Sequence, residues 1–264
     1  MHIVEEIIAE RAGKLMSRKR LFKLIKPILY RTLAYDAAVF LADAVAYKTG
    51  YEAFEFITDH INPQVSLKCL KNLPGSGRCI IVANHPTGLA DGIYVHQAIR
   101  DRRPDHIFFA NADVLRVVPN CRDIIIPVEW DKEKRSFSKT RETLTGCRKA
   151  LEGEKCIVIC PSGRLSHMTW RGLQERPWES SAAKLAKKYN APVVPLRIEA
   201  RNSWIFYVLS QLNTELRDVA LVKELLNKRG QIFRLTFGRP VDPATLPKDG
   251  NESTKIIRRI VETL

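Results

Sequence analysis

The sequence predicts an α/β fold, with a mixed, mostly parallel sheet flanked by helices and an N-terminal helical hairpin. From about residue 78 onward, short apolar and β-branched runs alternate with helical patterns, as in a sheet built with crossover helices. Residues 2–47 instead carry helical patterns. The 264 residues suffice for one sizeable core, so we expect an N-terminal element over residues 1–60 and a main domain over residues 61–264.

The first helical segment, residues 2–31, combines apolar residues at helical spacing with many Lys and Arg residues. This basic amphipathic pattern is interrupted near Gly13 and Pro27, and it is typical of helices that dock on membrane surfaces. A hairpin that packs on the core with its charges solvated gives the same pattern, so both interpretations stay open. A second helix is expected over residues 32–47, followed by Lys48-Thr49-Gly50 as a helix stop.

The strands of the main domain are expected where apolar and β-branched residues run together. They lie at residues 79–83, 107–110, 124–126, 156–160, 193–197 and 233–237. Helical patterns lie between or after them, at residues 89–101, 136–152, 179–189, 213–229 and 252–264. This alternation predicts helical crossovers and therefore a mostly parallel sheet.

The chain is strongly basic, with 43 Lys and Arg residues against 29 Asp and Glu residues and a formal charge of +14. This charge indicates an anionic partner, such as lipid headgroups, nucleic acid or the phosphates of CoA. The sequence contains no RNP-like aromatic strand, zinc finger or recognition-helix motif, so we expect no nucleic-acid partner. With 45% hydrophobic and 27% charged residues, the composition also argues against disorder.

A membrane-spanning helix is not expected, because spanning takes ~20 consecutive apolar residues. The best stretch, residues 33–47, is short and carries Asp36 and Asp43. The N-terminus also lacks the features of a signal peptide, so any membrane contact should be peripheral.

The cysteines and histidines form no recognisable metal motif. The six cysteines form no Cys-x-x-Cys pair and lie mostly in strand-like or helix-like segments, which predicts reduced, buried thiols in a cytosolic protein. His96, His106 and His167 are scattered, so we expect no metal site.

The strongest candidate for catalysis is His85, which follows the first strand of the main domain. The segment reads Asn84-His85-Pro86-Thr87-Gly88-Leu89-Ala90-Asp91, a turn leading into a helix. A carboxylate within one or two helical turns can accept the imidazole N–H and leave the other ring nitrogen as a proton acceptor. A structural histidine and a helix-capping Asp91 are the alternative interpretation.

When the His85 segment is considered together with segments further along the chain, the sequence resembles the glycerolipid acyltransferase family. This family contains the 1-acyl-glycerol-3-phosphate acyltransferases. The family's Asn-His block with an Asp after four residues is similar to Asn84-His85 to Asp91, which has one extra residue. The family's third block, Phe-Pro-Glu-Gly-Thr-Arg-Ser, is similar to Cys160-Pro161-Ser162-Gly163-Arg164-Leu165-Ser166. Ala191-Pro192-Val193-Val194-Pro195-Leu196 is a close match to the family's fourth block, an apolar run with two prolines. Residues 126–132 are the nearest counterpart of the second block, and residues 237–241 resemble the family's last strand and turn. The resemblance covers residues 78–243.

The resemblance implies acyl transfer from a thioester donor, acyl-CoA or acyl-carrier protein, to a lysolipid hydroxyl without an acyl-enzyme. His85 would take the hydroxyl proton while Asp91 holds the ring and stabilises the imidazolium. Backbone amides near Gly163 or the following helix start are the candidate oxyanion donors. No other cofactor is implied.

The same resemblance suggests a substrate-binding set around the catalytic pair. Its members are Asn84, Thr87, Gly88, Lys132, Ser162, Gly163 and Arg164. Arg164 follows a strand and a turn, where a guanidinium can grip a phosphate or another headgroup anion, although a solvent-facing loop Arg fits as well. Lys132 and Arg135 are weaker candidates, since such runs are usually solvated turns.

The acyl acceptor stays open between two classes. The resemblance favours a lysophospholipid such as 1-acyl-glycerol-3-phosphate. Another acceptor, such as a lyso-aminolipid, better explains the altered third block. In that block Ser162 replaces the family's Glu, and Arg164 stands one position earlier than the family's Arg. A non-catalytic binder of anionic membranes would explain the charge but not His85 and Asp91.

The expected location is the cytoplasmic face of a membrane, with peripheral attachment. Besides the N-terminal segment, a cluster of aromatic and basic residues follows the third block. It comprises Trp170, Arg171, Arg176, Pro177 and Trp178. These residues suit a membrane interface or lipid entrance, or else a loop that covers the sheet. The oligomeric state is not predicted.

Overall fold

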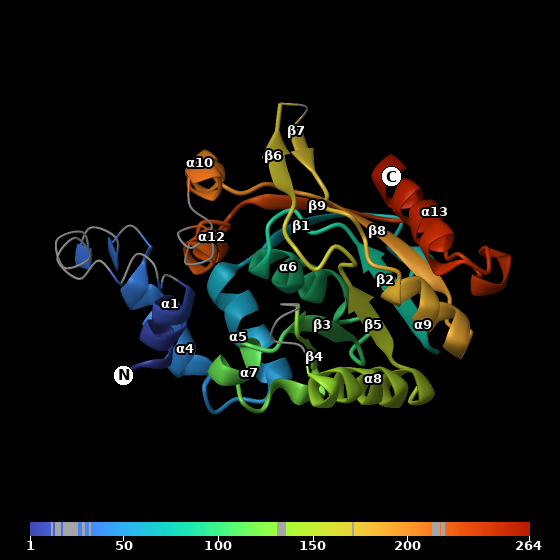
Figure 1. Cartoon of the computed structure of the whole chain (residues 1–264), viewed down its shortest axis with the longest axis horizontal. Coiled ribbons are helices and arrows are strands. Elements are labelled where there is room, and N and C mark those ends of the chain that lie inside the picture. The colour runs from blue at the N-terminus through green and yellow to red at the C-terminus, as the bar shows by residue number, and fades with distance from the viewer. Residues whose placement is uncertain are drawn as a thin grey trace.

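A computed structural model shows a seven-stranded sheet at the centre of the molecule (Figure 1). It describes residues 1–11, 13, 17, 26–27, 30–31, 33–130, 136–170, 172–212, 217 and 220–264. The strands, in sheet order, are β1 (Gln64–Lys68), β9 (Ile232–Phe237), β8 (Val193–Glu199), β2 (Cys79–Ala83), β5 (Cys156–Ile159), β3 (Ile107–Asn111) and β4 (Ile125–Val128). The β8–β9 pair is antiparallel and every other pair is parallel, which confirms the predicted mixed, mostly parallel sheet.

The central strands are apolar along their whole length because both faces of the sheet are covered. In β2, Cys79, Ile81 and Ala83 face one core, and Ile80 and Val82 face the other. The first core contains residues of α5 (Gly50–Ile61) and α6 (Leu89–Ile99). The second contains residues of α8 (Phe137–Glu152), α9 (Ser181–Tyr189) and α13 (Gly250–Thr263). The result is a three-layer arrangement in which β2 lies at the centre of the sheet.

The six predicted strands and the helices at α6, α8, α9 and α13 are confirmed to within a few residues. The prediction of one helix over residues 213–229 was partly wrong. A helix α10 (Trp204–Leu212) precedes this range, and the helix within it, α12 (Leu221–Leu226), is short. Residues 213–216 lie outside the described residues. The sequence reading also missed β1 and a two-stranded hairpin of β6 (His167–Thr169) and β7 (Gly172–Gln174). Figure 1 shows this hairpin projecting from the top of the molecule.

The N-terminal helices lie beside α5 (Figure 1). They are α1 (Ile3–Arg11) and α4 (Tyr35–Val45), and α4 fits the helix expected over residues 32–47. Thr49, which was expected to stop that helix, also caps α5 through a reciprocal pair of bonds with Glu52. Arg18, Lys19 and Arg20 of the basic segment lie outside the described residues. In the described part of the chain, no helix is both long and apolar enough to span a bilayer.

The cysteines follow the prediction in part. Cys79, Cys121, Cys147 and Cys156 are buried, and all six thiols are free. Cys69 is exposed, however, and Cys160 is half-buried at the end of β5, so the expectation of burial was wrong for these two.

Candidate active site

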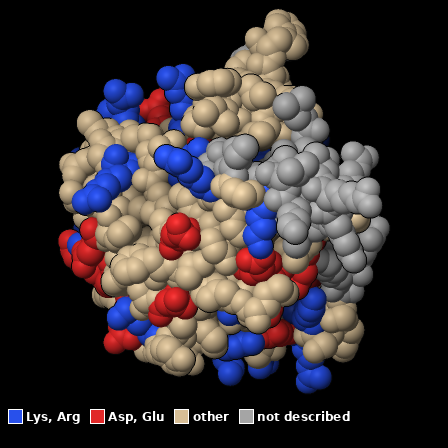
Figure 2. Space-filling view, turned by 90° about the vertical axis from the view of Figure 1, so that its left-hand side faces the viewer, with Lys and Arg blue, Asp and Glu red and all other residues tan. Residues whose placement is uncertain are grey.

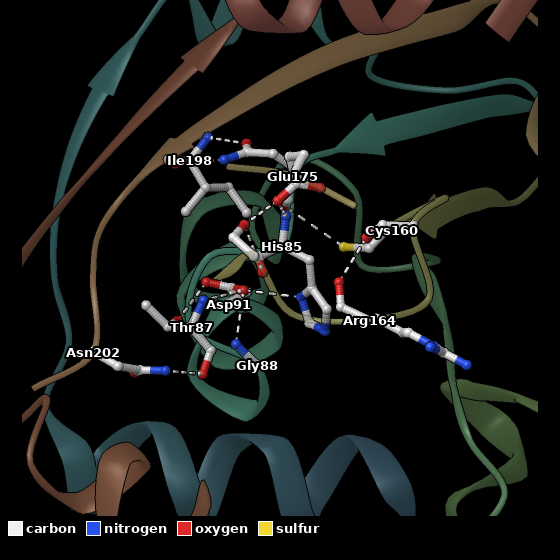
Figure 3. Close-up of polar contacts among 12 residues, drawn as sticks. His85, Thr87, Gly88, Asp91, Cys160, Arg164, Glu175, Ile198 and Asn202 are labelled. Atoms are coloured by element: carbon white, nitrogen blue, oxygen red, sulfur yellow. Dashed lines mark hydrogen bonds and ion pairs between the residues drawn. The ribbon is translucent and has the colours of Figure 1, made fainter. Parts of the chain in front are cut away.

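The candidate site lies just beyond the C-terminal end of β2, where ligands bind in open sheets of this kind. The strand ends at Ala83, and the chain turns through residues 84–88 before α6 begins at Leu89. Figure 3 shows His85, Thr87 and Asp91 gathered in this turn. The local sequence therefore places these polar side chains at the C-terminal edge of the sheet, where ligands bind in folds of this kind.

His85 and Asp91 lie against each other. Nδ1 of His85 is 2.9 Å from Oδ2 of Asp91, and the side chains are 25% and 2% exposed, respectively. The same carboxylate accepts the N–H groups of Thr87 and Gly88 at 2.9 and 3.0 Å and the Thr87 hydroxyl at 2.5 Å. Asp91 thus caps the helix start and also orients the imidazole. Because the carboxylate faces Nδ1, Nε2 is the nitrogen that is left to accept a proton.

Gly88 lies between His85 and Asp91, at the start of α6, and its backbone conformation suits glycine. Its φ is +88°, a conformation that residues with a Cβ rarely adopt. A Cβ at this position would also lie 2.9 Å from Cδ2 of Leu165 and 3.2 Å from Cδ2 of Leu221. The turn therefore needs glycine both for its backbone and for the close packing of the neighbouring segments.

The surroundings of His85 favour its protonated form. Burial lowers the pKa of the imidazole, whereas the nearby Cys160 sulfur and the Asp91 carboxylate raise it, and the net effect places the pKa of His85 well above its usual 6.5. Such an environment stabilises an imidazolium, which is the state a general base reaches when it takes a proton.

The backbone of His85 is held on both sides. Its carbonyl oxygen accepts the Ser166 N–H at 2.9 Å and the Ser166 hydroxyl at 3.2 Å. Its N–H donates to Oε1 of Glu175 at 3.0 Å, and Ser166 Oγ also donates to this oxygen (Figure 3). Oε2 of Glu175 accepts the indole N–H of Trp178 at 3.1 Å. Glu175, which the sequence reading missed, thus ties the catalytic turn to the third block and to the segment before α9.

The other members of the predicted set on this turn face the protein. Asn84 donates to the Ile198 carbonyl oxygen at 2.8 Å and accepts the Ile198 N–H at 2.7 Å, which ties the end of β2 to β8. Thr87 is buried, and its carbonyl oxygen accepts the Asn202 side chain at 3.3 Å. These contacts fix the position of the turn. A direct substrate contact of Asn84, Thr87 or Gly88 stays a prediction.

The third block forms a tight turn after β5. Gly163 has a φ of +58°, its N–H donates to the Cys160 carbonyl oxygen at 3.0 Å, and a Cβ there would lie 2.2 Å from the Trp130 ring. The Gly163 amide is therefore already paired within the turn. Ser162 is buried and donates to the Arg164 carbonyl oxygen at 2.8 Å. Arg164 itself is exposed, and Figure 3 shows its guanidinium extending away from the His85 ring.

The remaining basic candidates, Lys132 and Arg135, lie outside the described residues. His96 and His106 are buried together: Nδ1 of His96 is 2.9 Å from Nε2 of His106, and Nε2 of His96 is 2.7 Å from Glu55. His167 lies apart, at the start of β6. In the described ranges, no group of three or more His, Cys, Asp and Glu residues is arranged to hold a metal ion.

The two tryptophans after the third block have different environments. Trp178 is half-buried against the second core and bonds to Glu175, as expected of a covering loop. Trp170 is 87% exposed at the tip of the β6–β7 hairpin. The covering-loop interpretation therefore fits Trp178 but not Trp170.

Comparison with known proteins identifies the family. The model of the family described as Acyltransferase matches residues 64–199, which contain β2, the His85 turn, the third block and β8. The chain belongs to the acyltransferase family. It is therefore an acyl-transferring enzyme, and the resemblance of its sequence blocks to this family is confirmed.

Relatives of similar length share most of the chain. A lyso-glycine lipid O-acyltransferase from Phocaeicola vulgatus is 26% identical over 253 residues, covering 93% of this chain and 88% of the relative. A protein of the same name from Bacteroides thetaiotaomicron is 21% identical over 252 residues, covering 93% and 90%. The crystal structure of the 1-acyl-sn-glycerophosphate acyltransferase from Thermotoga maritima matches with a TM-score of 0.53 and 15% identity, covering 91% of this chain and 95% of that one. This last match shows that the fold is shared.

Proposed function

We propose that this enzyme transfers a fatty acyl group from a thioester donor to the hydroxyl of a lysolipid with an amino-acid headgroup, a lyso-glycine lipid in particular. The observation that carries the proposal is His85, whose Nδ1 lies 2.9 Å from the buried carboxylate of Asp91 in the turn that the family model covers. The two lyso-glycine lipid O-acyltransferase relatives favour this acceptor over 1-acyl-glycerol-3-phosphate, because the alignment with each of them covers 93% of this chain.

The proposed mechanism is a direct transfer with one general base. Nε2 of His85 takes the proton of the acceptor hydroxyl as that oxygen attacks the thioester carbonyl, and the imidazolium is stabilised by the Asp91 carboxylate at Nδ1. Collapse of the tetrahedral intermediate forms the ester and releases the thiolate of the donor, which His85 can reprotonate. Nε2 of His85 therefore accepts the proton of the hydroxyl and later donates it to the thiolate, which returns the enzyme to its starting state.

Arg164 is the proposed headgroup residue. An amino-acid headgroup that is linked through its nitrogen presents a carboxylate, which a guanidinium binds bidentately. Arg164 is exposed beside the catalytic turn, and it stands on the same short loop as the buried Ser162.

The donor and the location follow from the chemistry. Acyl-CoA or acyl-carrier protein supplies the thioester, and the reaction needs no other cofactor. Since a lysolipid resides in or on a bilayer, we place the enzyme peripherally at the cytoplasmic face of a membrane. The net charge of +14 supports attraction to anionic headgroups, to which the basic segment of residues 2–31 contributes.

Acyl transfer to a panel of purified acceptors tests the proposal. The enzyme is incubated with acyl-CoA and, separately, with acyl-carrier protein thioester, and products are quantified by mass spectrometry for lyso-glycine lipid and for 1-acyl-glycerol-3-phosphate. We expect kcat/KM to be at least about tenfold higher for the glycine acceptor, a difference of about 1.4 kcal/mol in transition-state binding. Equal or preferred use of the phosphate acceptor would refute the headgroup assignment.

A further inference from the structure

Four large apolar side chains are exposed at the end of the molecule formed by α10 and the β6–β7 hairpin. Trp170 is 87% exposed, and Trp204, Val208 and Ile205 are 74%, 46% and 38% exposed. We call these four residues, with the exposed Arg201 that precedes α10, the α10–hairpin surface. Isolated exposed apolar residues are common on proteins, but several large exposed apolar side chains on two elements that pack together indicate an interaction surface.

The two elements of this surface are packed together. The inward face of α10 contributes Phe206 and Tyr207 to a small core, to which Met168 and Leu173 of the hairpin also belong. The side chain of Gln211 donates to the Met168 carbonyl oxygen at 3.4 Å. Whereas Phe206 and Tyr207 of α10 are buried in this core, Trp204, Ile205 and Val208 remain exposed to solvent.

The charges of this region suit an anionic partner. By sequence, residues 163–174 and 200–212 contain no Asp or Glu and three Arg residues, Arg164, Arg171 and Arg201. In Figure 2, the hairpin that projects at the top of the molecule shows no acidic side chain. Tryptophan beside arginine, without carboxylates, is the composition of surfaces that enter the headgroup region of a bilayer.

The small core beneath the surface contacts the catalytic turn. Leu165 and Leu221, which pack on the same small core, lie close enough to Gly88 to exclude a side chain there. On the other side, the Asn202 N–H donates to the Tyr207 hydroxyl at 3.0 Å, and the Asn202 side chain donates to the Thr87 carbonyl oxygen at 3.3 Å. A bilayer that contacts α10 and the hairpin would therefore lie next to the turn that carries His85.

We propose that the α10–hairpin surface docks on an anionic phospholipid bilayer, with Trp170 and Trp204 inserted at the headgroup level. The inference rests on the proposed function in one respect, namely that the lysolipid acceptor is drawn from the bilayer. It places a membrane contact on elements that share a small core with the catalytic turn, and it adds this contact to the one expected of the basic N-terminal segment.

Vesicle sedimentation of the full chain tests the surface. The vesicles contain phosphatidylcholine alone or phosphatidylcholine and phosphatidylglycerol in equal parts. The variants are W170A/W204A and V208D, and the matched control is F137A, because Phe137 is 85% exposed at the start of α8, far from the hairpin in Figure 1. We expect wild type and F137A to bind the anionic vesicles, and W170A/W204A to bind about tenfold more weakly, since interfacial tryptophans contribute much of such binding.

Acyl transfer to two forms of the acceptor separates docking from catalysis. We expect W170A/W204A to lose transfer to vesicle-embedded lysolipid and to keep wild-type rates on detergent-dispersed lysolipid. Unchanged vesicle binding by both variants, or wild-type binding that does not depend on phosphatidylglycerol, would overturn the inference. A concentration-dependent dimer that the double variant abolishes would overturn it too, because the surface would then bind a second copy. If no lysolipid is acylated but Trp-dependent vesicle binding persists, the proposed function fails and the surface stands.

Discussion

Nδ1 of His85 lies 2.9 Å from Oδ2 of Asp91, although five residues separate the two in the sequence, one more than in the family's motif. The pairing survives because the turn absorbs the additional residue. Gly88 takes a φ of +88°, and its N–H, together with that of Thr87, donates to the Asp91 carboxylate. The motif's spacing is therefore less important than the position of the two side chains at the end of β2.

The Asp91 carboxylate, together with the Cys160 sulfur, should determine the pH dependence of acyl transfer. Because the pKa of His85 is raised above 6.5, the neutral base is present only above that raised value, and kcat/KM should increase with pH to a plateau. In Asp91→Asn, the rise should move to lower pH while the plateau falls by about 10²-fold, since the ring loses its orienting partner. A pH–rate profile of both proteins measures this. A profile that does not move in the variant would contradict the role of Asp91.

Gly88→Ala should damage both stability and activity. The conformation at φ +88° costs a residue with a Cβ about 1–3 kcal/mol, and the new methyl group would press on Leu165. We expect the free energy of unfolding in urea to fall by about that amount. Gly75→Ala is the control, since a Cβ at Gly75 meets no atom within 4 Å. Equal stability of the two variants would show that the turn tolerates a side chain.

Glu175 should act as a positioning residue. Glu175→Ala leaves the His85 N–H and the Trp178 indole without their acceptor and removes one of the two acceptors of the Ser166 hydroxyl, so the catalytic turn should shift. We expect kcat to fall by about 10²-fold with little change in KM, because small displacements of a catalytic group have effects of this size.

The conservative variant distinguishes positioning from general destabilisation. Glu175→Gln keeps an oxygen for the His85 N–H and should restore much of kcat, and Glu179→Ala, at an exposed neighbouring position, should resemble wild type. If the Ala variant retained wild-type kcat, or if the Gln variant were as impaired as the Ala variant, Glu175 would have no positioning role.

The buried His106 should make the fold sensitive to acid. Desolvation lowers the pKa of His106 from 6.5 to about 4, so the unfolded chain binds a proton more readily than the folded one between these values. Stability is then lost as pH falls through this window, by about 2 kcal/mol between pH 7.5 and pH 5 for this group alone. Urea unfolding at the two pH values measures the loss. His106→Gln should reduce the difference, and an unchanged difference would point to other groups.

Much of the fold could be predicted because the central strands are buried on both faces. β2 and β5 are short, uninterrupted apolar runs. Where such runs alternate with helical patterns, they can be recognised as buried strands. β1 has no such signal, since its residues are mostly exposed at the sheet edge. α10 was missed because its sequence, WIFYVLSQL, is apolar on both faces, so it shows no inward and outward sides.

The catalytic pair could be predicted from its position after a strand, but its support could not. Glu175 lies 90 residues from His85 in the sequence and contacts a backbone N–H, and any residue type except proline at position 85 would supply that donor. Ser166 acts in the same way, through the His85 carbonyl oxygen. Contacts of this kind leave no pattern of residue types, so they become visible only in three dimensions.

The most direct test of the central claim is the rate of ester formation by purified wild type and His85→Ala, with an acyl thioester and lyso-glycine lipid as substrates. Product is quantified by mass spectrometry, circular dichroism confirms that both proteins are folded, and His60→Ala serves as the matched histidine control. Loss of the general base should reduce kcat by about 10²-fold to 10⁴-fold in His85→Ala and leave the control unchanged. Equal rates in folded wild type and His85→Ala would contradict the assignment of His85 as the base.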